Sequence, residues 1–339
     1  MWQIIGQEDN VGLLRACLES DSLAHAYILT GPPHVGKMAL AINLAQAVNC
    51  TGDDAPCQLC PSCRRVLEDR HADVEIIGVG TAADDGASKS MIYIEQIQQL
   101  QTTANLAPFE GRYRVYIING AEHLSVPAAN CLLKTLEEPP EHVLMLLLAE
   151  NEQAVLETVL SRCQHLELRP MPATILEAAL MAEGAGADQP GLVARLAEGC
   201  AGWAKNALAD PRLLEGRSEV IDQLENAMAD GLDGRFALAR KMAGQYAGDH
   251  DRIFRTLKTW QSYFRDLLLV KTGGEVYLTN IDRERIMEST AAGLSAASIV
   301  NFTHELGNTI GSLRLNANPQ LAMEVLMLEM PVKGAGGKS

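Results

Sequence analysis

One short glycine-rich segment constrains the fold of this chain more than any other. The eight residues from Gly31 read Gly-Pro-Pro-His-Val-Gly-Lys-Met, so Gly31, Gly36 and Lys37 match the spacing G-x4-G-K. An apolar run at 26–30 predicts a buried strand before the segment, and the periodic apolar residues of 37–48 predict a helix after it. A strand, a glycine turn and a helix in this order distinguish a phosphate-binding P-loop from a chance glycine turn. Backbone N–H groups, the helix N-terminus and the lysine ammonium would hold phosphate there.

The rest of the first half predicts a parallel sheet. Short apolar runs alternate with helical patterns and lie at 74–79, 114–119, 144–148 and 165–168. Such alternation is typical of an α/β domain whose parallel sheet is covered by helices on both faces. We therefore expect a P-loop α/β domain over residues 1–168, with the small and polar stretch 78–90 as a mobile loop.

The second half predicts helices alone. Residues 169–209 predict a small helical domain with glycine-containing joints, and residues 210–339 predict a larger all-α domain whose last seven residues, 333–339, fray. Asn318 is placed to cap the last helix and Pro319 to begin it. One helix carries an apolar stripe that is expected to pack into its own domain, although an oligomer interface would have the same pattern; its residues are Ile253, Leu257, Trp260, Phe264 and Leu267.

The charge of the chain argues against a protein that binds DNA without partner subunits. The net charge is -15, and residues 1–168 hold 10 Lys and Arg against 22 Asp and Glu, whereas residues 169–339 hold 18 against 21. Affinity for DNA comes largely from neutralised phosphates, so an independent DNA-binding protein should be basic. No apolar run approaches the length of about 20 residues that a membrane helix needs, and the N-terminus lacks the pattern of a signal peptide. These features predict a cytoplasmic protein.

Four of the eight cysteines are clustered just after the P-loop helix. Their spacing is C-x6-C-x2-C-x2-C, over Cys50, Cys57, Cys60 and Cys63. Four thiolates at short spacings can close a tetrahedron around Zn²⁺, and a closed four-thiolate site is structural because no position is left for water. A redox C-x-x-C pair is the alternative, but it gives two of the four cysteines no role. The remaining cysteines are expected to be small buried side chains, because a cytoplasmic chain does not favour disulfides.

The predicted phosphate site lacks the residues that metal-dependent hydrolysis requires. Met38 stands where a P-loop carries Ser or Thr, and a thioether does not replace a hydroxyl oxygen as a ligand for Mg²⁺. The apolar strand at 115–118 should end in acidic residues that hold the metal and activate water, but Asn119 and Gly120 follow it. Glu122 is a carboxylate three residues beyond the metal position. Hydrolysis in this pocket is therefore not expected, whereas binding of ATP or ADP stays open.

Several segments together resemble a known family. They are Ile5–Gln7, His25–Tyr27, the four-cysteine insert, Asn130–Pro140 and Ser161–Cys163. In this combination the chain is similar over its whole length to the clamp-loader subunits of bacterial DNA polymerase III, which are AAA+ proteins. The resemblance implies an AAA+ P-loop domain at 1–168 with a zinc module at 50–63, a helical lid domain at 169–209 and a helical collar at 210–339 for oligomerisation.

The resemblance also separates two kinds of subunit. The gamma/tau motor keeps a Ser or Thr after the P-loop lysine and an Asp-Glu pair after the second strand, and the delta-prime subunit does not. With Met38, Asn119 and Gly120, this sequence is more similar to delta-prime. It implies no ATPase activity of its own, within a DNA-directed DNA polymerase holoenzyme.

Roles for individual residues follow from the same resemblance. Arg162 corresponds to the arginine that reaches the ATP of a neighbouring motor subunit, where a guanidinium supplied in trans stabilises the transferring phosphoryl group. An ordinary salt bridge is the alternative for Arg162. Asn151 corresponds to a polar sensor of the nucleotide, and Lys205 to a sensor arginine, which a lysine does not match in geometry. Lys134 lies on a helix that faces DNA in related loaders, although a solvated lysine is as good a description.

The implied partners are the gamma/tau motor and delta subunits, with the sliding clamp and primed DNA met as part of the complex. The implied activity is to help load the clamp on primed DNA. Two alternatives remain. One is a gamma/tau-type motor ATPase with atypical metal ligands, Glu122 serving as the metal carboxylate; the other is a zinc-module DNA-binding protein, which the acidic charge disfavours.

Overall fold

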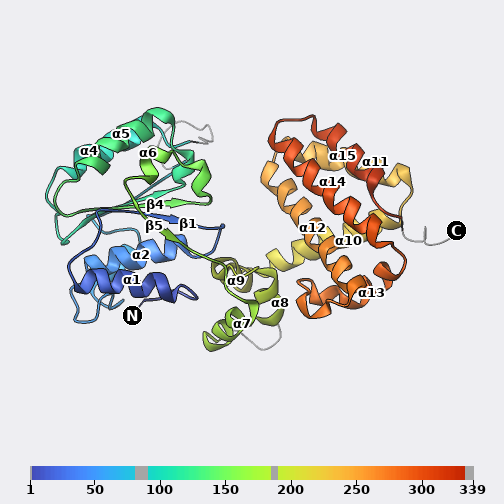
Figure 1. Cartoon of the computed structure of the whole chain (residues 1–339), viewed down its shortest axis with the longest axis horizontal. Coiled ribbons are helices and arrows are strands. Elements are labelled where there is room, and N and C mark those ends of the chain that lie inside the picture. The colour runs from blue at the N-terminus through green and yellow to red at the C-terminus, as the bar shows by residue number, and fades with distance from the viewer. Residues whose placement is uncertain (1, 81–90, 185–189, 333–339) are drawn as a thin grey trace. The chain divides into compact units, whose positions relative to one another are not determined.

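The chain divides into two compact units in the computed structural model (Figure 1). Residues 2–80, 91–184 and 190–332 are described, so most of the loop predicted at 78–90 and the predicted frayed tail lie outside the described residues. Unit 1 comprises Met1–Ala179 and Gly199–Trp203, and unit 2 comprises Leu180–Glu198 and Ala204–Ser339. The division into three domains at 168 and 209 stays a prediction.

Unit 1 is built on a sheet of five parallel strands. The predicted parallel sheet is confirmed, and the bounds differ from the predicted ones by at most one residue at each end: β1 Ala26–Thr30, β2 Val74–Gly78, β3 Arg114–Asn119, β4 Val143–Ala149 and β5 Gln164–Glu167. The strand order is β2-β3-β4-β1-β5, and every pairing is parallel. All five strands of a parallel sheet end at the same edge, which fixes where the predicted site residues meet.

Helices cover both faces of the sheet, as Figure 1 shows. α1 (Glu8–Glu19) and α2 (Lys37–Val48) pack on one face, and α4 (Ile94–Ala104) and α5 (Val126–Glu137) on the other. Successive residues of β1 point to opposite faces, so Tyr27 and Leu29 join one core cluster while Ala26 and Ile28 join the other. The smaller elements are α3 (Pro61–Leu67), η1 (Ala121–His123), η2 (Glu152–Ala154) and α6 (Glu157–Leu160).

The strand register defines two opposite edges of the sheet. Thr30 pairs with Ala149, so the ends of β1 and β4 lie together at the edge that we call the carboxyl edge. Tyr27 pairs with Gln164, so the residues just before β5 lie at the other end of the strands, the amino edge. Gly31 is four residues beyond Tyr27, and at the usual rise of a strand the two edges are roughly 13 Å apart along β1.

Unit 2 has an all-helical core. The helices that follow the sheet are α7 Ala173–Ala182, α8 Pro190–Leu196, α9 Ala201–Ala209, α10 Arg212–Ala229, α11 Leu232–Tyr246, α12 His250–Thr272, η3 Glu275–Tyr277, η4 Ile281–Arg283, α13 Glu284–Ala292, α14 Ala296–Arg314 and α15 Pro319–Glu329. All five residues of the predicted stripe are buried on α12 in the core of this unit. Asn318 caps α15 through a hydrogen bond from the Leu321 N–H, as predicted. In the described part of the chain, no helix is both long and apolar enough to cross a membrane.

Candidate functional site

The glycine-rich loop leaves β1 at the carboxyl edge and enters α2. Gly31 has φ +145°, and a Cβ on it would stand 2.4 Å from the Leu168 carbonyl oxygen, so a side chain does not fit at this position. Gly36 is the N-cap of α2, with φ +116°, and Lys37 is the first residue of the helix. The loop therefore has the strand-turn-helix path that the sequence predicts for a phosphate site.

Lys37 is held within this loop. Its Nζ donates hydrogen bonds to the carbonyl oxygens of Gly31 at 2.6 Å and Pro32 at 2.9 Å. Burial lowers the pKa of Lys37 because it disfavours the charged ammonium, while the carboxylates of Glu150 and Glu122 act in the opposite sense. The positive charge that would meet a phosphate is thus already engaged by backbone oxygens and lies near two carboxylates.

Met38, Asn119 and Gly120 occupy the positions where a P-loop ATPase has its metal ligands and its catalytic carboxylate. Met38 is partly buried and packs against the core of the α1–α2 face. Asn119 is the last residue of β3, and Gly120, with φ +89°, follows as the N-cap of η1. Among the described residues, Oε2 of Glu122 is buried without a hydrogen-bond partner, whereas its Oε1 accepts from the Glu150 N–H at 3.1 Å. The role of Glu122 as an atypical metal carboxylate stays a prediction.

Asn151 lies just after β4 at the same edge. It is exposed and caps η2, its Oδ1 accepting from the Gln153 N–H at 3.0 Å. The start of α9 also meets the loop, because the Gly202 N–H donates to the His34 carbonyl oxygen at 2.9 Å. Lys205, further along α9, pairs with Glu183 at 2.9 Å. The sensor roles of Asn151 and Lys205 stay predictions.

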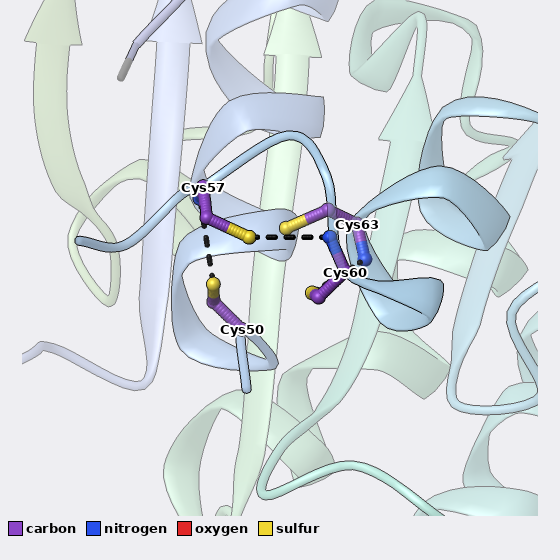
Figure 2. A group of neighbouring side chains, drawn as sticks. All are labelled: Cys50, Cys57, Cys60 and Cys63. Atoms are coloured by element: carbon purple, nitrogen blue, oxygen red, sulfur yellow. Dashed lines mark hydrogen bonds between the residues drawn. The ribbon is translucent and has the colours of Figure 1, made fainter. Parts of the chain in front are cut away.

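The four clustered cysteines converge, as the spacing predicts (Figure 2). Their Sγ atoms lie within 4.8 Å of one another, and the four side chains are buried or half-buried. Backbone N–H groups donate to the sulfurs of Cys50, Cys57 and Cys60 at 3.3 to 3.4 Å. Burial raises the pKa of the Cys60 thiol, but hydrogen bonds from Cys63 and Thr51 outweigh it and bring the pKa to about 5, which favours a thiolate. The four sulfurs lie close enough together to hold one metal ion.

Arg162 lies at the amino edge, away from the glycine loop. It lies two residues before the start of β5 and reaches the C-terminal end of α5, where Nε and Nη2 donate to Oε1 of Glu137 at 2.9 and 2.6 Å. Its Nη1 donates to the Thr158 carbonyl oxygen at 2.9 Å and to Ser161 Oγ at 3.1 Å. The salt bridge considered as an alternative is therefore present within the chain. Arg162 remains about one-third exposed.

At the amino edge, His25 and Asp73 make structural contacts that the sequence did not reveal. His25 Nε2 lies 3.0 Å from the Leu136 carbonyl oxygen, so the His25–Tyr27 segment ties the start of β1 to the end of α5. Asp73 is buried just before β2, and its carboxylate accepts three backbone N–H groups and the Arg114 guanidinium. The pattern of residues gave no signal for Asp73, because its partners come from a loop about 36 residues further on. Lys134 is exposed on α5, and its role stays a prediction.

The fold and loop define a class first. A parallel sheet with helices on both faces, a P-loop between β1 and α2, and helical segments after β5 give unit 1 the fold of an AAA+ P-loop domain. Comparisons with known proteins then give the family. Residues 6–172 match the family described as DNA polymerase III, delta subunit.

Relatives by sequence agree with this match. The chain is 28% identical over 317 residues to DNA polymerase III subunit delta' of Bacillus subtilis, covering 93% of both chains. It is 34% identical over 243 residues to subunit tau of Escherichia coli, covering 70% of this chain and 36% of tau, so it spans about a third of the length of that relative. A gamma subunit-related protein of Thermotoga maritima superposes with a TM-score of 0.47 at 16% identity, covering 93% of this chain and 97% of that one. The chain belongs to the DNA polymerase III clamp-loader family of delta-prime and gamma/tau subunits.

Proposed function

We propose that this chain is a non-hydrolysing subunit of the clamp loader that completes the ATP site of a neighbouring motor subunit. The observation that supports it most is the separation of two chemistries on one sheet. The carboxyl edge holds a P-loop with Met38, Asn119 and Gly120 in the metal positions, while Arg162 lies at the amino edge. A side chain on that edge does not reach the chain's own P-loop along β1, so a role for Arg162 in phosphoryl transfer requires a second subunit.

The chemistry proposed for Arg162 is electrostatic. A guanidinium supplied from a neighbour stabilises the charge that develops on the transferring phosphoryl oxygens, an effect worth about 10³ to 10⁵ in rate where it has been measured. Its planar donor fork suits phosphate oxygens in a way that a lysine ammonium does not. Arg162 is about one-third exposed, as a group that acts on a neighbour needs to be.

The assembly that we propose follows from the family. The chain would join gamma/tau motor subunits and a delta subunit, and would meet the sliding clamp and primed DNA as part of that complex. The acidic balance of residues 1–168 fits a subunit that leaves the DNA contacts largely to its neighbours. The helical unit 2 would supply the collar through which the subunits associate.

We further propose that the four-cysteine cluster holds structural Zn²⁺. An ion with four sulfurs at the usual Zn–S distance of about 2.3 Å holds them about 3.8 Å apart, and the four sulfurs lie within 4.8 Å of one another, so small side-chain rotations would complete the site. When bound, the ion would cross-link the segment from Cys50 to Cys63 without a site for water. Cys63 is fully buried, and Gln46 of α2 donates to its carbonyl oxygen at 2.8 Å, so the module is fastened to the P-loop helix.

A motor ATPase with atypical ligands is the second candidate, and one observation favours it. Glu122 has a buried carboxylate oxygen that no described residue satisfies, and this carboxylate acts on the charge of Lys37. Hydrolysis by the purified chain, measured with and without Mg²⁺, separates the two candidates. We expect no magnesium-dependent turnover; turnover that requires Mg²⁺ and disappears in Lys37→Ala would establish the motor instead.

The trans role is tested in the assembled complex. Arg162→Ala should lower ATP turnover without preventing assembly, and Arg162→Lys should not restore it because a lysine lacks the donor fork. Unchanged turnover of the complex with Arg162→Ala would remove the role.

A further inference from the structure

The ion pair between Arg162 and Glu137 leaves the arginine almost fully engaged within its own chain. A guanidinium has five N–H donors in a fixed plane. Four of the five contacts are made: Nε and Nη2 each donate to Oε1 of Glu137, and Nη1 donates to the Thr158 carbonyl oxygen and to Ser161 Oγ. One N–H of Nη2 is left without a partner among the described residues.

This arrangement cannot present two parallel donors to a phosphate. Bidentate recognition uses Nε with Nη2 or Nη1 with Nη2, and both pairs are partly occupied here. The Nε and Nη2 edge faces Glu137, and Nη1 faces the turn that carries Arg162 itself. A phosphate that is to receive two hydrogen bonds from Arg162 must take the place of the Glu137 carboxylate or of the turn.

The charge of its partners decides which contact of Arg162 a phosphate would replace. A carboxylate that stayed beside the guanidinium would lie a few ångströms from the phosphoryl oxygens, where like charges repel, and it would also offset the positive charge that the phosphoryl group needs. The neutral carbonyl of Thr158 and hydroxyl of Ser161 carry no such cost, and they come from the same turn as Arg162. Glu137 is half-exposed at the end of α5 and can turn away into solvent.

We propose that in the unassembled subunit Glu137 keeps Arg162 paired within its own chain, where the guanidinium is not available to a neighbour. When the shared site forms, the ATP phosphate on the neighbouring subunit displaces Glu137 from Arg162. This inference rests on the trans role proposed above and adds its regulation: the competing carboxylate lowers the fraction of subunits whose arginine is available. Exposed ion pairs are weak, so the competition changes availability by about two- to fivefold.

The test is ATP turnover by the assembled complex, at saturating ATP and Mg²⁺, with Glu137→Gln in this subunit. The amide keeps the size of the side chain and an acceptor oxygen but removes the charge. We expect turnover about two- to fivefold above that of the unaltered complex. Glu138→Gln is the matched control, because Glu138 is the next residue, is exposed and makes no ion pair with any residue the structure describes; it should leave turnover unchanged.

A double variant shows whether the effect acts through Arg162. In the Arg162→Ala background, Glu137→Gln should add nothing, and a rise in that background would overturn the inference. Unchanged or lowered turnover with Glu137→Gln alone would overturn it too, since a lowered value means that Glu137 orients the arginine rather than competing for it. If Arg162→Ala itself has no effect on turnover, the proposed function fails. If Arg162→Ala lowers turnover and Glu137→Gln does not raise it, only the inference that Glu137 competes for Arg162 fails.

Discussion

At the carboxyl edge of the sheet the backbone keeps the shape of a phosphate site while the side chains that would hold metal are absent, whereas at the amino edge the side chains are densely connected. Gly31, Gly36 and Lys37 form the loop of the first edge. The second edge has the Asp73 carboxylate, the His25 contact with α5, the cysteine cluster beyond the end of α2 and the partly exposed Arg162. The comparison teaches that missing metal ligands at one edge need not affect what the other edge offers to a neighbour.

The largest effect is expected from removing the metal site beside the amino edge. Structural zinc contributes on the order of 10 kcal/mol to the folding of the segment that binds it. Cys60→Ser, or chelation, should therefore unfold the segment from Cys50 to Cys63 while the strand ends at the carboxyl edge stay protected. Hydrogen exchange measures the protection of the two regions, and metal analysis measures whether the ion has been lost. Cys17→Ser, outside the cluster, is the control, and full protection of the segment without metal would contradict a structural site.

A smaller but clear loss of folding stability is expected from Asp73→Asn. An amide cannot accept all the N–H groups that the Asp73 carboxylate accepts, and it leaves Arg114 without its counter-charge, so the free energy of unfolding should fall by about 3 kcal/mol at pH 7. Urea unfolding measures the loss. Asp69→Asn, at an exposed carboxylate four residues earlier, should change it by less than about 0.5 kcal/mol.

The pH dependence of that loss checks its cause. Burial raises the pKa of Asp73, but the N–H donors of Glu110, Phe109 and Gly111 and the charge of Arg114 outweigh burial and bring the pKa below the ordinary value of 3.8. A carboxyl whose pKa is lowered by folding stabilises above its unfolded pKa and loses that contribution as pH falls through the folded one. The difference between wild type and Asp73→Asn should therefore be complete above pH 4 and shrink below it. A constant difference through the acid range would show that lost packing, not charge, is responsible.

The smallest effect is expected from returning oxygen ligands to the carboxyl edge. Met38→Thr with Asn119→Asp restores a hydroxyl and a carboxylate in the metal positions, and nucleotide affinity should become magnesium-dependent by about tenfold, or about 1.4 kcal/mol. Met38→Val with Asn119→Asp is the control, because valine has the shape of threonine without its oxygen. Equal magnesium dependence of the two variants would mean that the threonine hydroxyl does not bind Mg²⁺, so that restoring the ligand side chains alone does not rebuild the metal site.

Hydrolysis should not return in the same variant. The residue after Asn119 would need a carboxylate to activate water, but Gly120 has φ +89° and a Cβ there would lie 2.9 Å from the His123 ring. The backbone at Gly120 therefore does not accept a carboxylate side chain without strain.

The sequence predicts the parallel sheet, the P-loop, the convergence of the cysteines and the cap of α15, because each depends on local pattern or on short spacing. It also predicts that Asn119 and the loop meet, since parallel strands end at one edge. It did not reveal Asp73 as an anchor or Glu137 as the partner of Arg162. Both contacts join residues at least 25 positions apart, and only the packing of α5 and the β2–β3 connection brings them together.

The most direct test of the division between the two edges is ATP turnover by a loader assembled from motor subunits and this chain with Arg162→Ala. The account predicts normal assembly with turnover lowered at least tenfold, because the motor's transition state loses a guanidinium that this chain supplies. Turnover equal to that of the unaltered loader would contradict the account.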